Sequence, residues 1–233
     1  MLRKLLPLAL LLMSAWAATA DEADVKKAME AKLGAKVDSV TKAGYLGLYE
    51  VFSDGNIMYT DEKATAFIVG PLIDGKTMKN VTEERMRKLT AIKFGDLPLE
   101  RAIKQVRGDG KRVLATFEDP NCGYCKRLAK ELQKLENVTI YTFLYPILSE
   151  DSVRKSKQIW CSADRARAWN DWMVDGKAPA SKEDCDTSAV GKNQEFGRKL
   201  NISGTPTMFF GDGERVPGAI PLARIEQKLG QLR

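Results

Sequence analysis

Two cysteines with two residues between them, Cys122 and Cys125, are the side chains whose type and spacing best support chemistry. They enclose Gly123 and Tyr124, follow an expected buried strand and stand at the expected start of a helix. Free N–H groups and the positive end of the helix dipole stabilise a thiolate at such a position. A thiolate is the attacking species in thiol–disulfide exchange. The pattern predicts that Cys122 is a nucleophile and that Cys125, one turn inward and less exposed, resolves a mixed disulfide.

Other roles for this pair are less well supported by the sequence. Haem attachment requires a histidine after the second cysteine, where this chain has Lys126. The chain contains no histidine, which excludes a Ser-His-Asp triad, a Cys-His protease pair and a histidine-ligated metal. Zinc would need a second close pair of ligands, and Cys161 and Cys185 are far apart. We therefore expect no metal and no cofactor. A purely structural Cys122–Cys125 bridge stays open, although so short a loop removes little chain entropy.

Cys161 and Cys185 make up the remaining pair. A disulfide between them would close a loop that contains Pro179 and several polar residues. A loop near that size is worth about 3 kcal/mol in the chain-entropy model. We favour a structural role for this pair, with a second redox centre as the alternative.

Residues 1–20 are typical of a secretory signal peptide. Arg3 and Lys4 precede a short apolar run over 5–13, and Ala18-Thr19-Ala20 is a small-residue cleavage site, so we expect the mature chain to begin at Asp21. A membrane anchor is the alternative, but the run is shorter than the roughly 20 residues that span a bilayer. An exported chain enters an oxidising compartment, where disulfides persist.

The overall charge does not indicate a nucleic-acid partner. The formal charge is +6, and removing residues 1–20 removes two basic residues and no acids, which leaves +4. Basic and acidic residues are interspersed, and no basic stripe with interleaved aromatic residues is present.

The spacing of apolar residues predicts two domains, with an α+β and α/β fold overall. Residues 21–80 are expected to form a helix over 21–35 and a small antiparallel meander, with strands at 45–52, 57–59 and 66–69 and a turn at 53–56. A unit this small has difficulty burying enough surface alone, and self-association is one remedy. Residues 81–98 are interpreted as a helical linker, because the helix expected over 82–93 and capped by Thr82 is mostly polar.

Residues 99–233 are expected to form the second, α/β domain. Its predicted elements are a short helix at 99–106, a buried strand at 111–117, a helix at 122–135, a strand at 138–144, helices at 150–174 and 195–200, a hairpin at 207–210 and 214–216, and a helix at 221–232.

Several motifs together resemble the DsbC disulfide isomerases of the bacterial periplasm, members of the thioredoxin superfamily. The motifs are Cys122-Gly123-Tyr124-Cys125, Ile159-Trp160-Cys161, Cys185-Asp186, Gly204-Thr205-Pro206 and Val216-Pro217-Gly218. The resemblance implies an N-terminal cystatin-like dimerisation domain, a helical linker and a thioredoxin-like catalytic domain with a helical insertion. It also implies a V-shaped homodimer.

The resemblance assigns roles to particular residues and partners. Cys122 would be the nucleophile and Cys125 the resolving thiol, and Cys161 and Cys185 would form the structural disulfide. Gly123, Tyr124, Thr205 and Pro206 would bind substrate, with Thr205-Pro206 as a cis-proline loop. From the residues alone, a trans bond is the more common outcome. Substrates would be misfolded, disulfide-containing exported proteins, and a membrane thiol reductase of the DsbD type would keep the pair reduced.

One position departs from the thioredoxin pattern. Thioredoxin carries a buried acid six residues before its first cysteine, where this chain has Thr116. Glu118 and Asp119 are expected to be solvated at a strand end, with a catalytic role as the less favoured alternative. Lys126 and Arg127 either add positive potential near Cys122 or lie on the helix surface.

The leading functional hypothesis is therefore a periplasmic disulfide isomerase that works through a mixed disulfide at Cys122. The alternatives are a dithiol oxidase, a reductase that protects single thiols or sulfenates, and a holdase chaperone.

Overall fold

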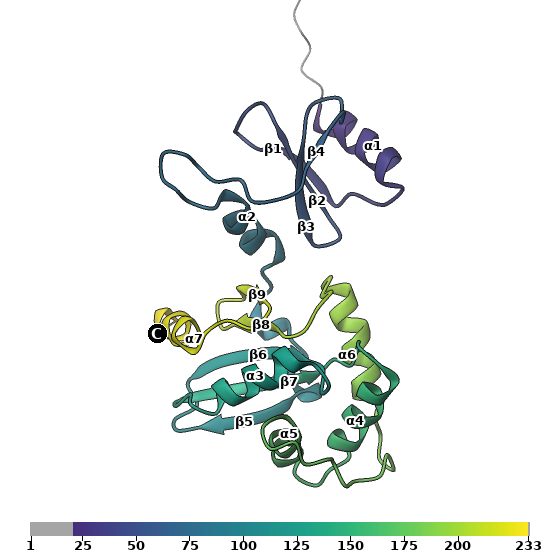
Figure 1. Ribbon diagram of the computed structural model, residues 1–233, viewed down its shortest axis with the longest axis vertical. Coiled ribbons are helices and arrows are strands. Elements are labelled where there is room, and N and C mark those ends of the chain that lie inside the picture. The colour runs from purple at the N-terminus through teal and green to yellow at the C-terminus, as the bar shows by residue number, and fades with distance from the viewer. Residues whose placement is uncertain (1–20, 233) are drawn as a thin grey trace, which may run out of the picture. The chain divides into compact units, whose positions relative to one another are not determined.

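The structure is a computed structural model that describes residues 21–232. The chain divides into two compact units, with the boundary between Val69 and Gly70 (Figure 1). The predicted signal segment, residues 1–20, lies outside the described residues. Every helix within residues 21–232 is too short or too polar to cross a bilayer. The domain boundaries expected at residues 80, 98 and 99 stay a prediction.

The first unit combines one helix with an antiparallel sheet whose strand order is β1-β2-β3-β4. Its elements are α1 (Glu22–Leu33), β1 (Ser39–Lys42), β2 (Tyr49–Ser53), β3 (Asn56–Thr60) and β4 (Phe67–Ile68). α1 ends at Gly34, which adopts the left-handed conformation with φ 62° and donates its N–H to the Glu30 carbonyl. Val25 and Met29 of α1 are fully buried against the sheet residues Val40 and Val51.

The strand predicted over 45–52 begins four residues later than expected, and β1 was not predicted. Gly44, Leu46 and Gly47 all have positive φ, so the chain turns between β1 and β2 instead of continuing as a strand. Leu48 N–H closes this turn on the Tyr45 carbonyl at 2.9 Å. Leu46 is 90% exposed, so its apolar side chain indicated a strand that the backbone does not form.

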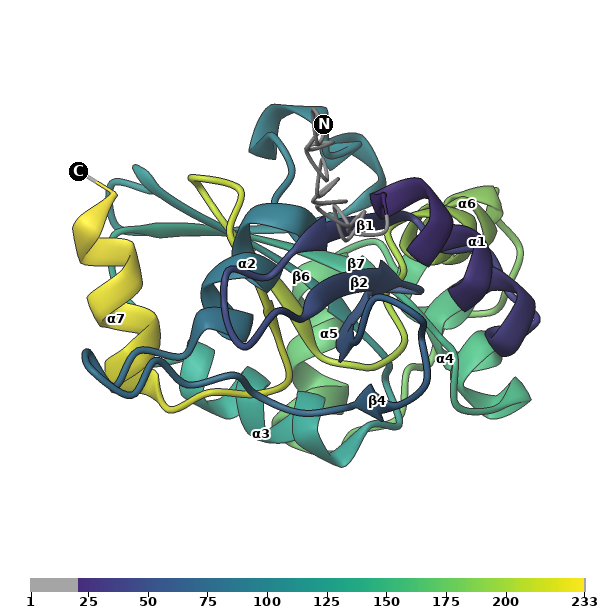
Figure 2. The same ribbon diagram turned by 90° about the horizontal axis from the view of Figure 1, so that it is seen from above.

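The second unit contains a five-stranded sheet of order β5-β7-β6-β8-β9, in which β6 and β7 are parallel and the other neighbours antiparallel. The strands are β5 (Ile103–Arg107), β6 (Arg112–Glu118), β7 (Val138–Leu144), β8 (Thr207–Phe210) and β9 (Arg215–Pro217). The helices are α2 (Val81–Thr90), α3 (Gly123–Leu132), α4 (Glu150–Trp160), α5 (Arg165–Met173), α6 (Ser188–Lys199) and α7 (Leu222–Gln231), with 3-10 turns at Phe94–Asp96 and Leu99–Arg101. Figures 1 and 2 show α6 and α7 at opposite ends of this unit.

Apolar side chains cover both faces of this sheet. On one face, Leu114 of β6 packs with Leu128 and Leu132 of α3 and with residues of α7. On the other face, the rings of Phe117 and Phe143 stack with centroids 4.7 Å apart. Because side chains alternate along β6, Leu114, Thr116 and Glu118 share the α3 face and Phe117 takes the other.

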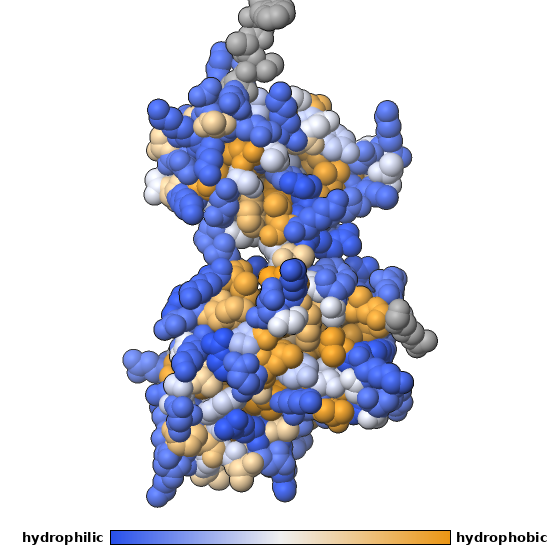
Figure 3. All heavy atoms as spheres, turned by 180° about the vertical axis from the view of Figure 1, so that it is seen from behind, coloured by the Kyte–Doolittle hydropathy of each residue, from blue (hydrophilic) through white to orange (hydrophobic). Residues whose placement is uncertain are grey.

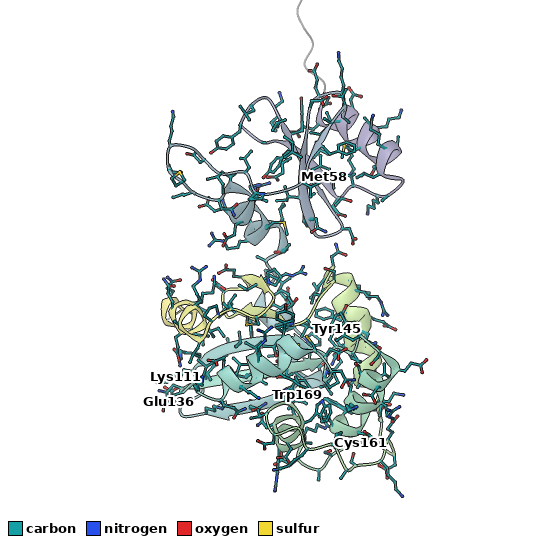
Figure 4. The ribbon with its side chains drawn as sticks, viewed as in Figure 1. Met58, Lys111, Glu136, Tyr145, Cys161 and Trp169 are labelled. Carbon is teal, nitrogen blue, oxygen red and sulfur yellow. A yellow bond between two sulfur atoms is a disulfide. The ribbon has the colours of Figure 1, made fainter. Side chains whose placement is uncertain are left out.

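The helical insertion, which comprises α4 and α5 after β7, forms a third hydrophobic cluster beside α3. It brings Trp169 and Met173 of α5 and Ile159 of α4 against Cys125 and Ala129. Trp169, labelled in Figure 4, is buried.

A disulfide joins Cys161, at the C-terminal end of α4, to Cys185, with the Cα atoms 5.5 Å apart. Figure 4 labels Cys161 at the end of α4.

Three sequence-based expectations for this unit were wrong in detail. The helix expected at 99–106 is a single 3-10 turn followed by β5, because Ile103 is buried and Lys104 exposed in the alternation of an edge strand paired with β7. The helix expected at 195–200 is the end of the longer α6. α2 is capped by Asn80, whose side chain accepts the Glu83 N–H at 3.0 Å, and not by Thr82.

Candidate active site

The two thiols stand where β6 passes into α3. β6 ends at Glu118, and Cys122 is the N-cap residue of α3, with extended backbone at φ −74° and ψ 119°. Both cysteines are free thiols in this structure. Cys122 retains 7% of its surface whereas Cys125 retains none, so a disulfide arriving from solvent can meet only the first sulfur.

The Thr205–Pro206 peptide bond is cis, and this loop lies against Cys122. Cys122 Sγ donates to the Thr205 carbonyl oxygen at 3.3 Å, which joins two segments that are far apart in the sequence. The Pro206 carbonyl accepts the Gly218 N–H at 2.8 Å, so the Val216-Pro217-Gly218 motif holds the loop from its other side.

The remaining predicted substrate-binding residues line the approach to Cys122. Tyr124 is 59% exposed, and the Arg127 guanidinium lies 4.4 Å from the centre of its ring. A Cβ placed on Gly123 would have no neighbour within 4 Å, so the space beside this residue is open. Gly123 and Tyr124 are thus exposed next to Cys122 in the chain, Thr205 contacts its sulfur, and Pro206 is buried.

The sequence predicted that helix amides hold the sulfur, and the structure shows a different contact for the thiol. Cys122 Sγ makes no cap hydrogen bond to α3 and is bonded to Thr205 instead. A protonated thiol is a donor and therefore selects a carbonyl oxygen. Cys122 itself is the N-cap of α3, so its sulfur lies at the N-terminal end of that helix.

Asp119 is fully buried, and the expectation that it is solvated was wrong. Its Oδ1 accepts the Asn121 N–H at 2.8 Å, and its Oδ2 accepts the N–H groups of Ile147 and Leu148 at 2.8 and 3.0 Å. This carboxylate ties the loop before Cys122 to the loop after β7. Its role is to position the active-site loop, because both its oxygens are occupied by backbone donors.

Glu118 is also fully buried, again contrary to the expectation of a solvated strand end. Its Oε1 accepts a hydrogen bond of 2.7 Å from Thr116 Oγ1, which lies 3.3 Å from Thr142 Oγ1. Its Oε2 has no hydrogen-bond partner within residues 21–232. Burial raises the pKa of Glu118 to about 7, against the opposing effect of the Thr116 hydroxyl.

Cys125 lies in a cluster of buried apolar side chains that includes Ile159 and Trp169. Burial raises the pKa of its thiol, and the nearby charges of Glu118 and Cys122 raise it further. The second thiol therefore keeps its proton at neutral pH and would have to lose it before it could attack another sulfur.

Trp172 of α5 is a site residue that sequence reasoning missed. Its Nε1–H donates to the Pro120 carbonyl at 2.6 Å, which fixes the loop before Cys122. Lys126 Nζ lies 4.1 Å and Lys155 Nζ 4.8 Å from the centre of its ring, so Lys126 is held by a cation–π contact. The motif gives no signal for Trp172, because it comes from an insertion about fifty residues later in the chain.

Comparison with known proteins identifies both halves of the chain. Residues 16–83 match the family described as the disulfide bond isomerase protein N-terminal domain, and residues 99–233 match the thioredoxin-like domain. The chain is 50% identical over 196 residues to a probable thiol:disulfide interchange protein DsbC of Bordetella pertussis, covering 84% of this chain and 69% of that one. It is 28% identical over 222 residues to the thiol:disulfide interchange protein DsbC of Escherichia coli K12, covering 92% and 89%.

The chain is also similar to the solved structure of a disulfide interchange protein. The crystal structure of a disulfide interchange protein from Neisseria gonorrhoeae is 40% identical, covers 58% of this chain and 97% of its own, and superposes with a TM-score of 0.55. With its N-terminal and thioredoxin-like matches in this order, the chain belongs to the DsbC family of thiol:disulfide interchange proteins.

Proposed function

We propose that this chain is a periplasmic disulfide isomerase that rearranges wrong disulfides in exported proteins. The observation that carries the proposal is the unequal exposure of the two thiols: Cys122 is reachable at a helix N-terminus and Cys125 is enclosed behind it. The relatives named as thiol:disulfide interchange proteins support the same chemistry.

The reaction begins at Cys122. Its thiolate attacks one sulfur of a substrate disulfide, forms a mixed disulfide and releases the other substrate sulfur as a thiolate. A substrate thiolate attacks a different substrate disulfide, and a later attack on the mixed disulfide frees Cys122 as a thiolate. Electrons balance, because one substrate disulfide has been exchanged for another and the enzyme ends as it began.

A second exit avoids stalled complexes. When rearrangement fails, the Cys125 thiolate attacks Cys122 Sγ, forms the Cys122–Cys125 disulfide and releases the substrate thiolate. The substrate is then reduced and the enzyme oxidised, so a reductant must restore the dithiol. We propose a membrane thiol reductase of the DsbD type as its source.

Substrate backbone is proposed to lie along Gly123, Tyr124, Thr205 and Pro206. The Thr205 carbonyl is 3.3 Å from Cys122 Sγ, so a chain segment running past this loop presents its sulfur to the nucleophile. The exposed Tyr124 ring offers an apolar contact that does not depend on a particular sequence.

We also propose that the first unit makes the protein a homodimer. Its last strand, β4, is an edge strand whose residues Phe67 and Ile68 are 42% and 53% exposed, and Val69 directly after it is 81% exposed. Figure 3 shows hydrophobic residues among hydrophilic ones on the surface of this unit. A second copy would cover such an edge and add the buried area that a small unit lacks.

The test is recovery of activity from a substrate with scrambled disulfides, using the mature chain and a glutathione buffer. We expect Cys122→Ser to abolish recovery, because no mixed disulfide can form. We expect Cys125→Ser to retain rearrangement and to accumulate the covalent complex, because only the second exit is lost. Unchanged recovery with Cys122→Ser would refute the proposal. Faster oxidation of reduced substrate than rearrangement of scrambled substrate would indicate a dithiol oxidase instead.

A further inference from the structure

We propose that Glu118 is the proton acceptor for the Cys125 thiol when Cys125 resolves a mixed disulfide at Cys122. The inference rests on the proposed thiol–disulfide exchange and adds a residue to it.

The register of β6 against α3 directs Glu118 toward the cysteine pair. Leu114 on the same strand face packs with Leu128 and Leu132 of α3. The chain reverses direction after Glu118, so the end of β6 faces the start of α3. Cys125 lies three residues before Leu128 on the buried face of that helix. It therefore faces the end of β6, where Glu118 lies.

One oxygen of this carboxylate is held and the other is not. Thr116 fixes Oε1 at 2.7 Å, whereas Oε2 is buried without a hydrogen-bond partner within residues 21–232. A buried polar atom without a partner is destabilising, and such atoms in native proteins call for an explanation. A proton arriving from Cys125 would give Oε2 the partner that it lacks.

The charges around this pair come from few groups. From α3, Cys125 and Cys122 face the site, and the charge on Glu118 raises the pKa of Cys125. From β6 and β7, Thr116 and Thr142 present hydroxyls that do not titrate near neutral pH.

The neighbouring charged side chains are directed elsewhere. The carboxylate of Asp119 is occupied by loop amides. Lys126 and Lys155 lie over the ring of Trp172. Desolvation therefore dominates at Glu118, and a pKa of about 7 lets the carboxylate take up and release a proton in the working range.

The proposed step transfers one proton, forms one disulfide bond and breaks another. The Glu118 carboxylate takes the proton of the Cys125 thiol and becomes a neutral carboxylic acid. The Cys125 thiolate attacks Cys122 Sγ, the Cys122–Cys125 bond forms, and the bond to the substrate sulfur breaks. The substrate leaves as a thiolate with the electron pair of that bond. Reduction by the proposed DsbD-type partner reverses the step and returns the proton to Cys125.

The experiment separates attack by Cys122 from resolution by Cys125. The dithiol protein is mixed with excess oxidised glutathione and quenched with acid, and mass spectrometry measures the glutathione adduct and the internal disulfide over time. Glu118→Gln keeps the size of the side chain and an oxygen for Thr116, but cannot accept a proton. We expect it to form the adduct at the normal rate and to resolve it about 100-fold more slowly, the lower end of what general acid–base catalysis contributes.

The pH profile distinguishes proton transfer from a structural role. In the unmodified chain, the rate at which the adduct converts to the internal disulfide, plotted against pH, should change slope near the pKa of Glu118. Glu118→Gln should lose this inflection. Thr116→Val removes the hydrogen bond that favours the charged carboxylate, so the inflection should move to higher pH. Glu50→Gln, a matched change at a buried glutamate of β2, is the control and should alter neither rate nor profile.

Two results would overturn the inference. Resolution by Glu118→Gln at the unmodified rate and with the unmodified pH profile would show that the carboxyl has no part in proton transfer, while leaving the proposed function intact. Absence of both the adduct and the internal disulfide in the unmodified chain would refute the proposed function, and the inference with it.

Discussion

Replacing Glu118 by glutamine should change the stability of the second unit in a way that depends on pH. The measurement uses a Cys122→Ser background, which keeps Cys125 and cannot form the active-site disulfide. In this background the glutamate and glutamine chains differ only in a buried group that can ionise. The difference in their free energies of unfolding therefore reports the titration of Glu118.

The sign follows from the direction of the shift. Below its ordinary pKa of 4.5, the carboxyl is neutral in both the folded and the unfolded chain. Between 4.5 and about 7, the unfolded chain releases the proton and the folded chain retains it. Stability falls with rising pH where the folded state binds more protons. The glutamate chain should thus lose stability across this window, and above it the difference from glutamine should be constant.

The size of the effect follows from the same two values. The pKa of Glu118 rises from 4.5 in the unfolded chain to about 7 in the folded chain. At 1.36 kcal/mol for each pKa unit, the ionised glutamate lowers the free energy of unfolding by about 3 kcal/mol. Glu118 is fully buried, so solvent screening does not reduce this figure. We expect the two chains to be similarly stable at pH 4 and glutamine to be more stable by about 3 kcal/mol at pH 8.

Denaturant unfolding followed by tryptophan fluorescence measures this difference. Apart from Trp16 in the predicted signal segment, the tryptophans are Trp160, Trp169 and Trp172, which all belong to the second unit. Their emission therefore follows the unit that contains Glu118. A difference between the chains that is the same at pH 4 and pH 8, or glutamine becoming relatively less stable as pH rises, would refute the account of a buried carboxyl with a raised pKa.

Three further changes test the scaffold. Replacing Cys161 and Cys185 together by alanine should lower the free energy of unfolding by about 3 kcal/mol, the chain-entropy value for a loop of this size, and denaturant titration that finds no loss would contradict a stabilising role. Asp119→Ala removes the acceptor of three backbone N–H groups and should cost about 3 kcal/mol and speed amide hydrogen exchange at Ile147; unchanged exchange there would show that the carboxylate does not hold the loop. Phe117→Ala should cost about 4 kcal/mol in thermal unfolding, whereas the control Val106→Ala, on the exposed side of an edge strand, should cost less than about 0.5 kcal/mol; equal losses would place the core elsewhere.

Sequence patterns predicted the elements whose apolar spacing is local and strong. β6, β7, α3 and the β8–β9 hairpin lie where the alternation and helical spacing placed them. The pattern failed where a residue's surroundings outweighed its type. The exposed Leu46 gave a strand signal in a loop, and the stretch after Leu99 was expected to be a helix although β5 pairs with β7. An edge strand gains its hydrogen bonds from a partner far along the chain, and local propensity does not contain that information.

The thiol chemistry could be predicted from local sequence alone, because a strand, two cysteines with two residues between them and a helix are consecutive in the chain and need no distant partner. The contacts that distant segments make around those sulfurs exist only in the folded chain. It brought the Thr205 carbonyl to Cys122 and Trp172 to the loop before it. It also enclosed Glu118, which the sequence placed at a solvated strand end. Burial depends on what packs over a residue, and only the folded chain brings those segments together.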